Sequence, residues 1–140
     1  MSAQLYRTSS EEETIALGRR FAEAISRPVT VLLIGELGAG KTTLAKGIVD
    51  GLGAAPAEDV SSPTFTLIHE YGNDVYHIDL YRLDTPAEIM RLGLEELLER
   101  NAVVLVEWGE RFPWMWPEDR VEIRIAVEGD DREFRVTGLG

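Results

Sequence analysis

The chain has 140 residues and a formal net charge of −11, from 25 acidic and 14 basic side chains, a length that predicts one domain over residues 1–140. It has no cysteine, which excludes disulfides and thiolate metal sites, and its acidity opposes direct binding to nucleic acid. Without an apolar run of the roughly 18 residues that span a membrane, or the apolar core of a signal peptide, we expect a cytoplasmic protein with no membrane partner.

The first elements in chain order are a helix and a strand. Hydroxyl and acidic side chains at 8–13 predict a capped helix start, an apolar stripe continues to Ile25, and Arg27-Pro28 ends the helix. The acids are most simply a solvated first turn, and the alternative is that Glu11 lies against a nucleotide base. Residues 29–34 are apolar and β-branched, which predicts a buried strand.

A phosphate-binding loop follows this strand. Residues 35–42 fit the pattern G-x-x-x-x-G-K-[ST], and residues 43–52 read as the helix that this motif requires. The glycines let backbone N–H groups converge on an anion, Lys41 reaches the β- and γ-phosphates, and the Thr42 hydroxyl suits Mg²⁺. We therefore predict a nucleoside triphosphate site. Its loop residues are Gly35, Glu36, Leu37, Gly38, Ala39, Gly40, Lys41 and Thr42.

The lysine content narrows the choice of nucleotide. The only lysines are Lys41 and Lys46, so the N-K-x-D motif that reads guanine in GTPases cannot occur after the loop. This favours ATP over GTP as the ligand.

The segment at 62–64 is a candidate switch loop. A small-residue loop at 53–59 precedes it, and Pro63 biases Ser62 away from a helical conformation. P-loop switch proteins keep their γ-phosphate sensor at this position, so Ser62, Pro63 and Thr64 are candidates for that role. Ordinary turn chemistry is the alternative.

The remaining segments predict a mixed α/β fold. Strands at 64–71 and 75–80 form a hairpin around Gly72-Asn73-Asp74, a helix covers 86–98, and 103–106 reads as a central parallel strand. An irregular loop at 111–119 precedes a second hairpin, 120–127 with 132–136. The expected architecture is a P-loop NTPase fold, with a mixed, largely parallel central sheet flanked by helices.

Two acids compete for the metal side of the site. Glu107 follows four apolar strand residues, the stronger pattern for a metal carboxylate, and Asp79 ends a hairpin arm. We assign Glu107 to Mg²⁺, directly or through water, and Asp79 to a supporting metal role or to the attacking water. The alternative for either acid is a solvated carboxylate at a strand end. Trp108 either packs in the core or shapes the γ-phosphate pocket or a partner surface. The two histidines, His69 and His77, have no partners at metal-binding spacing.

The motifs in order resemble the TsaE (YjeE) family, the ATPase component of bacterial tRNA threonylcarbamoyladenosine biosynthesis. They are GELGAGKTT at 35–43, SPTFTL at 62–67, HIDLYRL at 77–83, Gly93 and VEW at 106–108. The resemblance covers roughly residues 10 to 135. The family often has Asp where Glu36 stands, which keeps the charge.

This resemblance implies a function. Proteins of this family bind ATP with Mg²⁺ and hydrolyse it slowly alone. They join a TsaB–TsaD pair that transfers threonylcarbamoyl to the adenosine beside the anticodon, in tRNAs reading codons that begin with A. The ATP cycle is thought to reset that complex for further turnovers. The net charge of −11 suits a subunit that reaches tRNA only through these partners.

The resemblance also implies residue roles. Lys41 and Thr42 match phosphate and Mg²⁺ contacts, Thr43 a contact near the α-phosphate, and Glu107 a metal ligand. Family positions needed for activity are Asp79, Trp108 and the 62–64 loop. The N-terminal stretch and the last hairpin contribute to the nucleotide pocket, which we extend to Glu11 and Arg132.

Two other functions fit a P-loop. A small-molecule kinase would use the same loop, although the sequence has no lid insertion with clustered arginines to close over an acceptor. A nucleotide-dependent binding switch would need ATP binding but not hydrolysis.

Overall fold

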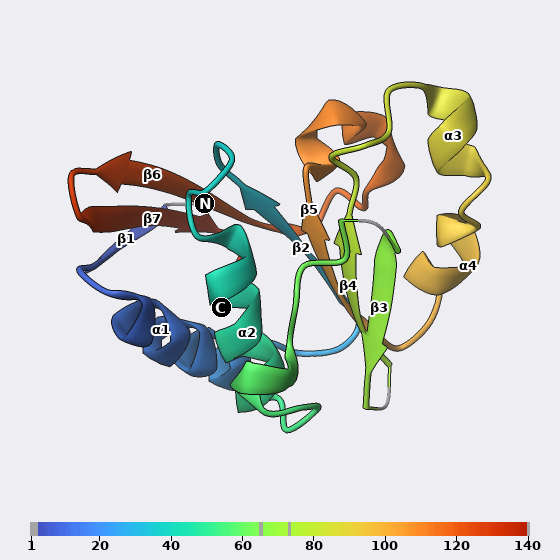
Figure 1. The fold of residues 1–140 in the computed structure, drawn as a ribbon. Coiled ribbons are helices and arrows are strands. Elements are labelled where there is room, and N and C mark those ends of the chain that lie inside the picture. The colour runs from blue at the N-terminus through green and yellow to red at the C-terminus, as the bar shows by residue number, and fades with distance from the viewer. Residues whose placement is uncertain (1–2, 65, 73, 140) are drawn as a thin grey trace.

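The fold is organised by one seven-stranded sheet, seen in a computed structural model that describes residues 3–64, 66–72 and 74–139 (Figure 1). The strand order across the sheet is β1-β7-β6-β2-β5-β4-β3. The strands are β1 (Gln4–Thr8), β2 (Val29–Ile34), β3 (Ile68–Tyr71), β4 (Val75–Asp79), β5 (Val103–Glu107), β6 (Val121–Glu128) and β7 (Asp131–Thr137). The α-helices are α1 (Glu11–Ala24), α2 (Lys41–Gly51), α3 (Pro86–Met90) and α4 (Leu94–Leu98).

The centre of the sheet is parallel and its margins are antiparallel. β2 pairs in parallel with β5 and β6, and β5 pairs in parallel with β4. Antiparallel pairs extend the sheet on both sides, β6–β7–β1 on one and β4–β3 on the other. The apolar runs of β2 and β5 fit a central position because both faces of these strands are covered. The predicted mixed α/β fold is confirmed.

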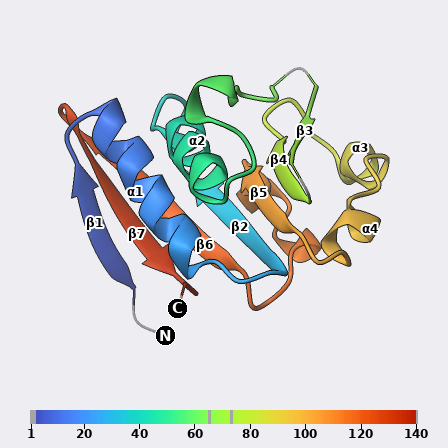
Figure 2. The same ribbon diagram turned by 90° about the horizontal axis from the view of Figure 1, so that it is seen from below.

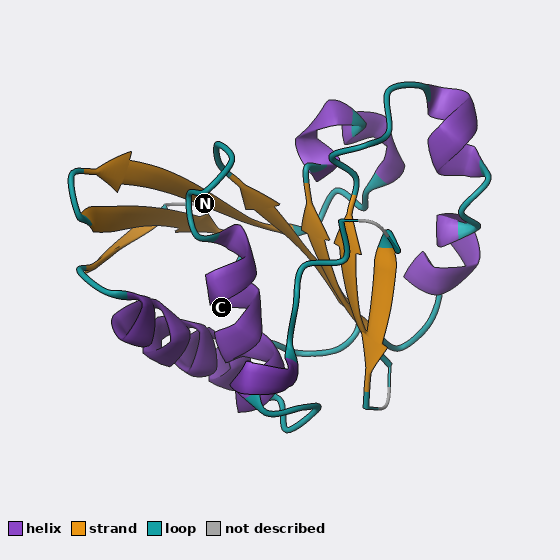
Figure 3. Cartoon of the chain, viewed as in Figure 1, coloured by secondary structure: helices purple, strands orange, loops and turns teal. Residues whose placement is uncertain are grey.

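Two layers of helix cover the sheet (Figures 2 and 3). On one face, α1 and α2 enclose a core in which Leu44 and Ile48 meet Leu33 and Leu105. On the other face, α3, α4 and the turns after β5 cover a second core. Because side chains alternate along a strand, β4 directs Val75, His77 and Asp79 to the first face.

The two helices of the first layer meet through glycines. A Cβ at Gly47 of α2 would collide with the carbonyl oxygen of Ile15 in α1, and one at Gly18 would lie 2.6 Å from the Leu44 carbonyl oxygen. The backbones therefore approach closely along this contact. This packing fixes α2, and with it the loop that begins the helix.

The predicted helix at 86–98 is wrong in one respect. The chain forms two short helices, α3 and α4, with Gly93 between them in the left-handed conformation at φ 69°. The apolar spacing continues across Gly93, but this backbone conformation interrupts the helical hydrogen bonds. Pro86 begins α3 as predicted, behind a capping box between Thr85 and Glu88.

Other boundaries differ from the predicted ones. The prediction missed β1, a short edge strand with mostly exposed residues. β3 starts at Ile68 because Leu67 has a positive φ of 70°, so residues 64, 66 and 67 precede the strand instead of belonging to it. Short 3₁₀ turns occupy Ala57–Asp59 and Pro113–Met115, which both lie within predicted loops. A third, Gly109–Arg111, ends at the first residue of the loop predicted at 111–119. Phe65 in the predicted strand and Asn73 in the predicted turn lie outside the described residues.

Within the ranges that the structure describes, none of the helices has the length and apolar character needed to cross a membrane.

Candidate functional site

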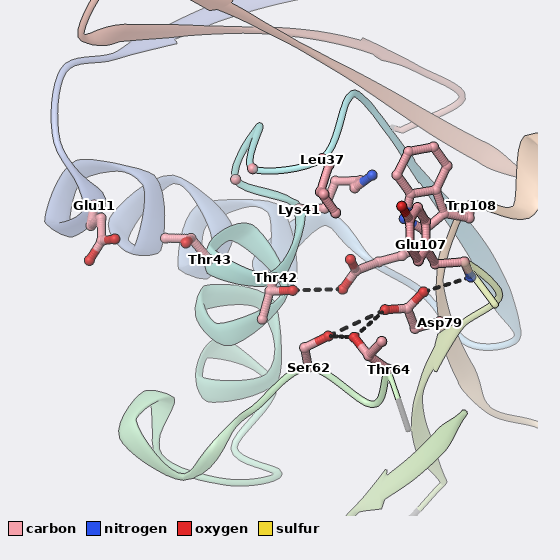
Figure 4. A pocket seen from close by; sticks show the side chains of 13 residues that line it. Glu11, Leu37, Lys41, Thr42, Thr43, Ser62, Thr64, Asp79, Glu107 and Trp108 are labelled. Atoms are coloured by element: carbon pink, nitrogen blue, oxygen red, sulfur yellow. Dashed lines mark hydrogen bonds between the residues drawn. The ribbon is translucent and has the colours of Figure 1, made fainter. Parts of the chain in front are cut away.

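The predicted site residues come together at the carboxyl ends of the central strands. β2 runs into the P-loop, and its neighbour β5 ends at Glu107, directly opposite Asp79 at the end of β4. A cavity of about 360 Å³ opens at this edge (Figure 4). The predicted residues that line it are Glu11, Leu37, Gly38, Gly40, Lys41, Thr42, Thr43, Ser62, Thr64, Asp79, Glu107 and Trp108. This edge is where open α/β sheets bind ligands.

The P-loop has the backbone conformation of an anion site. Gly38 and Gly40 have positive φ values of 80° and 110°, and α2 begins at the next residue, Lys41. No side chain caps this helix start, so the backbone N–H groups of its first turn remain available for an anion. The helix dipole adds favourable potential for phosphate at the same point.

Lys41 is a buried cation inside this loop. The residue is 4% exposed. Its Nζ donates to the Gly35 carbonyl oxygen at 2.6 Å and lies 3.4 Å from the ring centroid of Trp108. Burial lowers the pKa of Lys41, while the nearby Glu107 carboxylate acts in the opposite direction. A buried ammonium group without a full counter-charge is costly, so an anion that binds next to it would be stabilised.

Glu107 is the acid that contacts the P-loop. Its Oε2 accepts hydrogen bonds from the Thr42 hydroxyl at 3.0 Å and from His77 Nε2 at 2.5 Å. The residue is 3% exposed. The two groups predicted to hold Mg²⁺, the Thr42 hydroxyl and the Glu107 carboxylate, therefore lie next to each other.

Asp79 instead holds the loop at 62–64. Its Oδ2 accepts from Thr64 Oγ1 at 3.0 Å and from Ser62 Oγ at 3.3 Å, and its Oδ1 accepts from the backbone N–H of Tyr81 at 2.9 Å (Figure 4). Pro63 between the two hydroxyl residues is buried. The candidate switch loop thus connects directly to a strand-end carboxylate.

Trp108 adopts an unusual backbone conformation beside the P-loop. Its φ is 66°, in the left-handed region that non-glycine residues seldom occupy. Its ring faces the Lys41 ammonium and lies 5.1 Å from the Tyr81 ring, with the Arg111 guanidinium 5.0 Å from its centroid. The ring packs against the second core and also lines the cavity, so the expected packing is present and a role at the γ-phosphate stays a prediction.

A second cavity adjoins the first. It is lined by Glu11 and Arg132, the two predicted site residues that belong to no motif. Its volume is about 380 Å³, and Glu11, Gly38, Gly40 and Thr43 line both cavities. Arg132 lines only the second, where its Nε approaches Gly40. Glu11, the first residue of α1, is exposed behind the Ser10 N-cap, as expected of a solvated first turn, and it also borders this cavity.

Three residues of the P-loop lie away from the main cavity. Gly35, Glu36 and Ala39 line a separate groove against β6. Ala39 donates its N–H to the Glu36 carbonyl oxygen at 3.0 Å, which closes the turn of the loop. A Cβ at Gly35 would lie 2.9 Å from the Ile125 carbonyl oxygen, so this glycine allows the loop to pass close to β6. These residues shape the loop.

Sequence reasoning missed three residues at the site. His77 bonds Glu107, Tyr81 lines the cavity, and Arg111 donates to the Tyr81 carbonyl oxygen at 2.7 Å. The alternation along β4 could have identified His77, because it shares a face with Asp79. Arg111 ends the 3₁₀ turn Gly109–Arg111, and the sequence around it gave no such signal.

The donor set fits a Mg²⁺ ion held mainly by phosphate. A hydroxyl and a carboxylate are the hard oxygen ligands that Mg²⁺ prefers, and it usually takes only one or two carboxylates from a protein. In the part of the chain that the structure describes, no three His, Cys, Asp or Glu side chains form a group that could hold a metal by themselves. A cation here would therefore depend on the nucleotide and water.

Comparisons with known proteins agree on one family. The family model for the threonylcarbamoyl adenosine biosynthesis protein TsaE matches residues 8–134. The tRNA threonylcarbamoyladenosine biosynthesis protein TsaE of Bacillus subtilis (strain 168) is 43% identical over 140 residues, covering 96% of this chain and 85% of the relative. The protein of the same description from Haemophilus influenzae is 36% identical over 141 residues, covering 93% and 88%.

A solved structure has the same fold. The crystal structure of Bacillus subtilis YdiB superposes with a TM-score of 0.78 at 35% sequence identity. The match covers 99% of this chain and 87% of that one.

Proposed function

Because the chain belongs to the TsaE family, whose role is in tRNA threonylcarbamoyladenosine biosynthesis, we propose that it is the ATPase component of that process. In this proposal residues 1–140 act as one P-loop domain that binds ATP with Mg²⁺ and hydrolyses it slowly alone. The modified base is the adenosine beside the anticodon in tRNAs reading codons that begin with A.

One observation carries the proposal. Lys41, Thr42 and Glu107 converge at the N-terminus of α2, where an anion would meet backbone N–H groups, a buried ammonium, a hydroxyl and a carboxylate together. A Gly-rich turn with only a structural role would not need a buried lysine beside a buried acid, because both are costly to bury.

The roles of the residues follow from their positions. Lys41 would leave the Gly35 carbonyl oxygen and the Trp108 ring for the β- and γ-phosphates, and the α2 N–H groups would bind the phosphate oxygens. Thr42 and Glu107 would hold Mg²⁺ or its water, and Thr43 would contact the nucleotide near the α-phosphate. With Mg²⁺ held there, the negative charge on the β- and γ-phosphate oxygens would be partly neutralised while the γ-phosphoryl group passes to water and ADP leaves.

Asp79 would orient the attacking water. Its two oxygens already hold Ser62, Thr64 and the Tyr81 N–H, so a change in the 62–64 loop would change what Asp79 can contact. This connection offers a route by which γ-phosphate binding alters the loop. The second cavity, with Glu11 and Arg132, would receive the ribose and base.

The proposed partners are TsaB- and TsaD-like proteins. The net charge of −11 argues against a direct tRNA contact and for access to tRNA through this pair. The ATP cycle would then serve repeated turnovers of the transferase complex rather than the transfer itself.

Reconstitution tests the proposal. The purified chain is incubated with Mg·ATP alone and with TsaB and TsaD, and both phosphate release and modified adenosine per complex are followed. We expect weak hydrolysis alone, stimulation by the pair, and more than one modification per complex only when this chain and ATP are present. Hydrolysis that is the same with and without the pair, or several turnovers without this chain, would contradict the proposal.

A further inference from the structure

His77 is a buried polar group whose role the proposed function leaves open. It lies on β4 with its side chain 0% exposed. Its partner in the β4–β5 register is Leu105, and Glu107 is two residues further along β5 on the same face. A diagonal neighbour at this spacing is within reach of a long side chain. The ring therefore approaches Glu107 from the sheet, whereas Thr42 approaches it from α2.

The ring has one polar contact. Its Nε2 lies 2.5 Å from Glu107 Oε2, and its Nδ1 has no hydrogen-bond partner among the residues that the structure describes. An ionised carboxylate only accepts hydrogen bonds, so the proton belongs on Nε2 and the ring is the donor. A charge-assisted bond of this length is among the stronger side-chain hydrogen bonds.

Glu107 Oε2 receives two donors, His77 Nε2 and the Thr42 hydroxyl. With one oxygen held in this way, the carboxylate has little freedom to rotate, and Oε1 is the oxygen left for a ligand. We propose that His77 is a positioning residue that orients Glu107 towards Mg²⁺ or its water. This inference rests on the proposed function, because it concerns how that site binds Mg·ATP. Ligating carboxylates commonly need such outer partners.

A histidine that only fills space in the core would respond differently to substitution. Packing in the core requires only a side chain of similar volume, whereas orienting Glu107 requires a hydrogen-bond donor at the position of Nε2. Glutamine can put an amide N–H₂ near that place, whereas the shorter asparagine reaches only the place of Nδ1. Comparing His77→Gln with His77→Asn therefore separates the two roles with side chains of the same chemistry.

His69 supplies the matched control. It is the register partner of His77 on β3, and its Nδ1 contacts the Tyr71 hydroxyl at 3.1 Å instead of Glu107. The variants His69→Gln and His69→Asn change a neighbouring histidine in the same way without touching the carboxylate.

The experiment measures ATP binding by calorimetry, with Mg²⁺ and with EDTA, in the full chain and each folded variant. The readout is the ratio of the two affinities, which reports the contribution of Mg²⁺ separately from nucleotide binding. We expect His77→Asn to reduce this ratio roughly tenfold with little change in EDTA, His77→Gln to restore most of it, and both His69 variants to match the unchanged chain. A ratio in His77→Asn equal to that of the unchanged chain would overturn the inference.

A second readout does not depend on nucleotide. Two-bond ¹H–¹⁵N spectra of the free chain should show His77 protonated at Nε2 and bare at Nδ1, and Glu107→Gln should shift the Nε2 signal. A ring protonated at Nδ1 alone would overturn the inference. If the unchanged chain bound ATP equally with Mg²⁺ and with EDTA, the proposed Mg·ATP site itself would be wrong. The positioning role of His77 would then have no metal to act on.

Discussion

Asp79 and Glu107 lie directly opposite each other at the ends of β4 and β5, but their carboxylates bind different groups. Glu107 bonds Thr42 and His77, whereas Asp79 bonds the loop at 62–64 and the Tyr81 N–H. Two adjacent acids would repel each other without such separate environments. The separation gives each acid its own expected function, one on the metal side and one on the loop side.

The isosteric amides at these positions should therefore have different effects. We expect Glu107→Gln to weaken ATP binding in Mg²⁺ by about tenfold and to leave binding in EDTA unchanged. Asp79→Asn should bind Mg·ATP almost normally but hydrolyse it roughly a hundredfold more slowly in the presence of the partner pair. Calorimetry and phosphate release measure the two effects. If the two variants had the same profile, the division of roles would be wrong.

Asp79→Asn also addresses the binding-switch alternative. A variant that binds ATP without hydrolysing it should support only a single round of tRNA modification, if hydrolysis resets the complex. Repeated modification by this variant would show that binding alone is sufficient.

The P-loop region was predictable because its determinants are local. The apolar run of β2, the fixed glycines and the helical spacing of α2 are all contained in residues 29–52, and the structure has β2 with the predicted boundaries. The hairpin of β6 and β7 was likewise predictable, because alternating strands flank a turn at 129–130. Neighbouring residues decide each of these elements.

Other features depend on distant parts of the chain. β1 is an edge strand whose exposed residues show little pattern, and its place in the sheet comes from pairing with β7, at the other end of the sequence. The bond between His77 and Glu107 depends on the register of two parallel strands, which no local pattern determines. The break at Gly93 is local, but the apolar spacing that continues across it conceals the left-handed backbone conformation of this residue.

We expect Lys41 to lower the stability of the nucleotide-free protein and to strengthen nucleotide binding. Burial lowers its pKa below the ordinary 10.5, so holding the ammonium inside the fold costs free energy. We expect Lys41→Met to reduce ATP affinity by roughly ten- to a hundredfold, yet to raise the Tm of the nucleotide-free chain at pH 7. Lys46→Met, on the same helix but only partly buried, is the control.

The effect of Lys41 on stability should depend on pH with a definite sign. Below the lowered pKa both the folded and the unfolded chain hold the proton, so the full cost of burial is present. As the pH rises from that pKa towards 10.5, the folded chain releases the proton first and the cost disappears. The Tm difference between Lys41→Met and the unchanged chain should therefore shrink in this range. A difference that grew with pH would contradict the argument.

The conformation of Trp108 predicts an unusual order of stability. At φ 66° a residue with a Cβ is strained by about 1 kcal/mol, whereas glycine is not. Trp108→Gly and Trp108→Ala both remove the ring and its contact with Lys41. We therefore expect the glycine variant to be the more stable of the two by about 1 kcal/mol in urea unfolding, although both should bind ATP less tightly than the unchanged chain. Equal stability, or a more stable alanine variant, would show that this backbone conformation is not retained.

The close contact of α1 and α2 predicts that one methyl group is enough to disturb the site. Gly47→Ala would place a Cβ against the Ile15 carbonyl oxygen and Gly18, both backbone groups that cannot move aside alone. Since α1 and α2 would have to separate, we expect a loss of about 1–3 kcal/mol in the free energy of unfolding, although alanine is the better helix former. ATP affinity should fall as well, because α2 carries Lys41 and Thr42 at its start. Lys46→Ala, one residue away, should leave both the unfolding free energy and the ATP affinity nearly unchanged, and a Gly47→Ala variant as stable as this control would exclude the close helix contact.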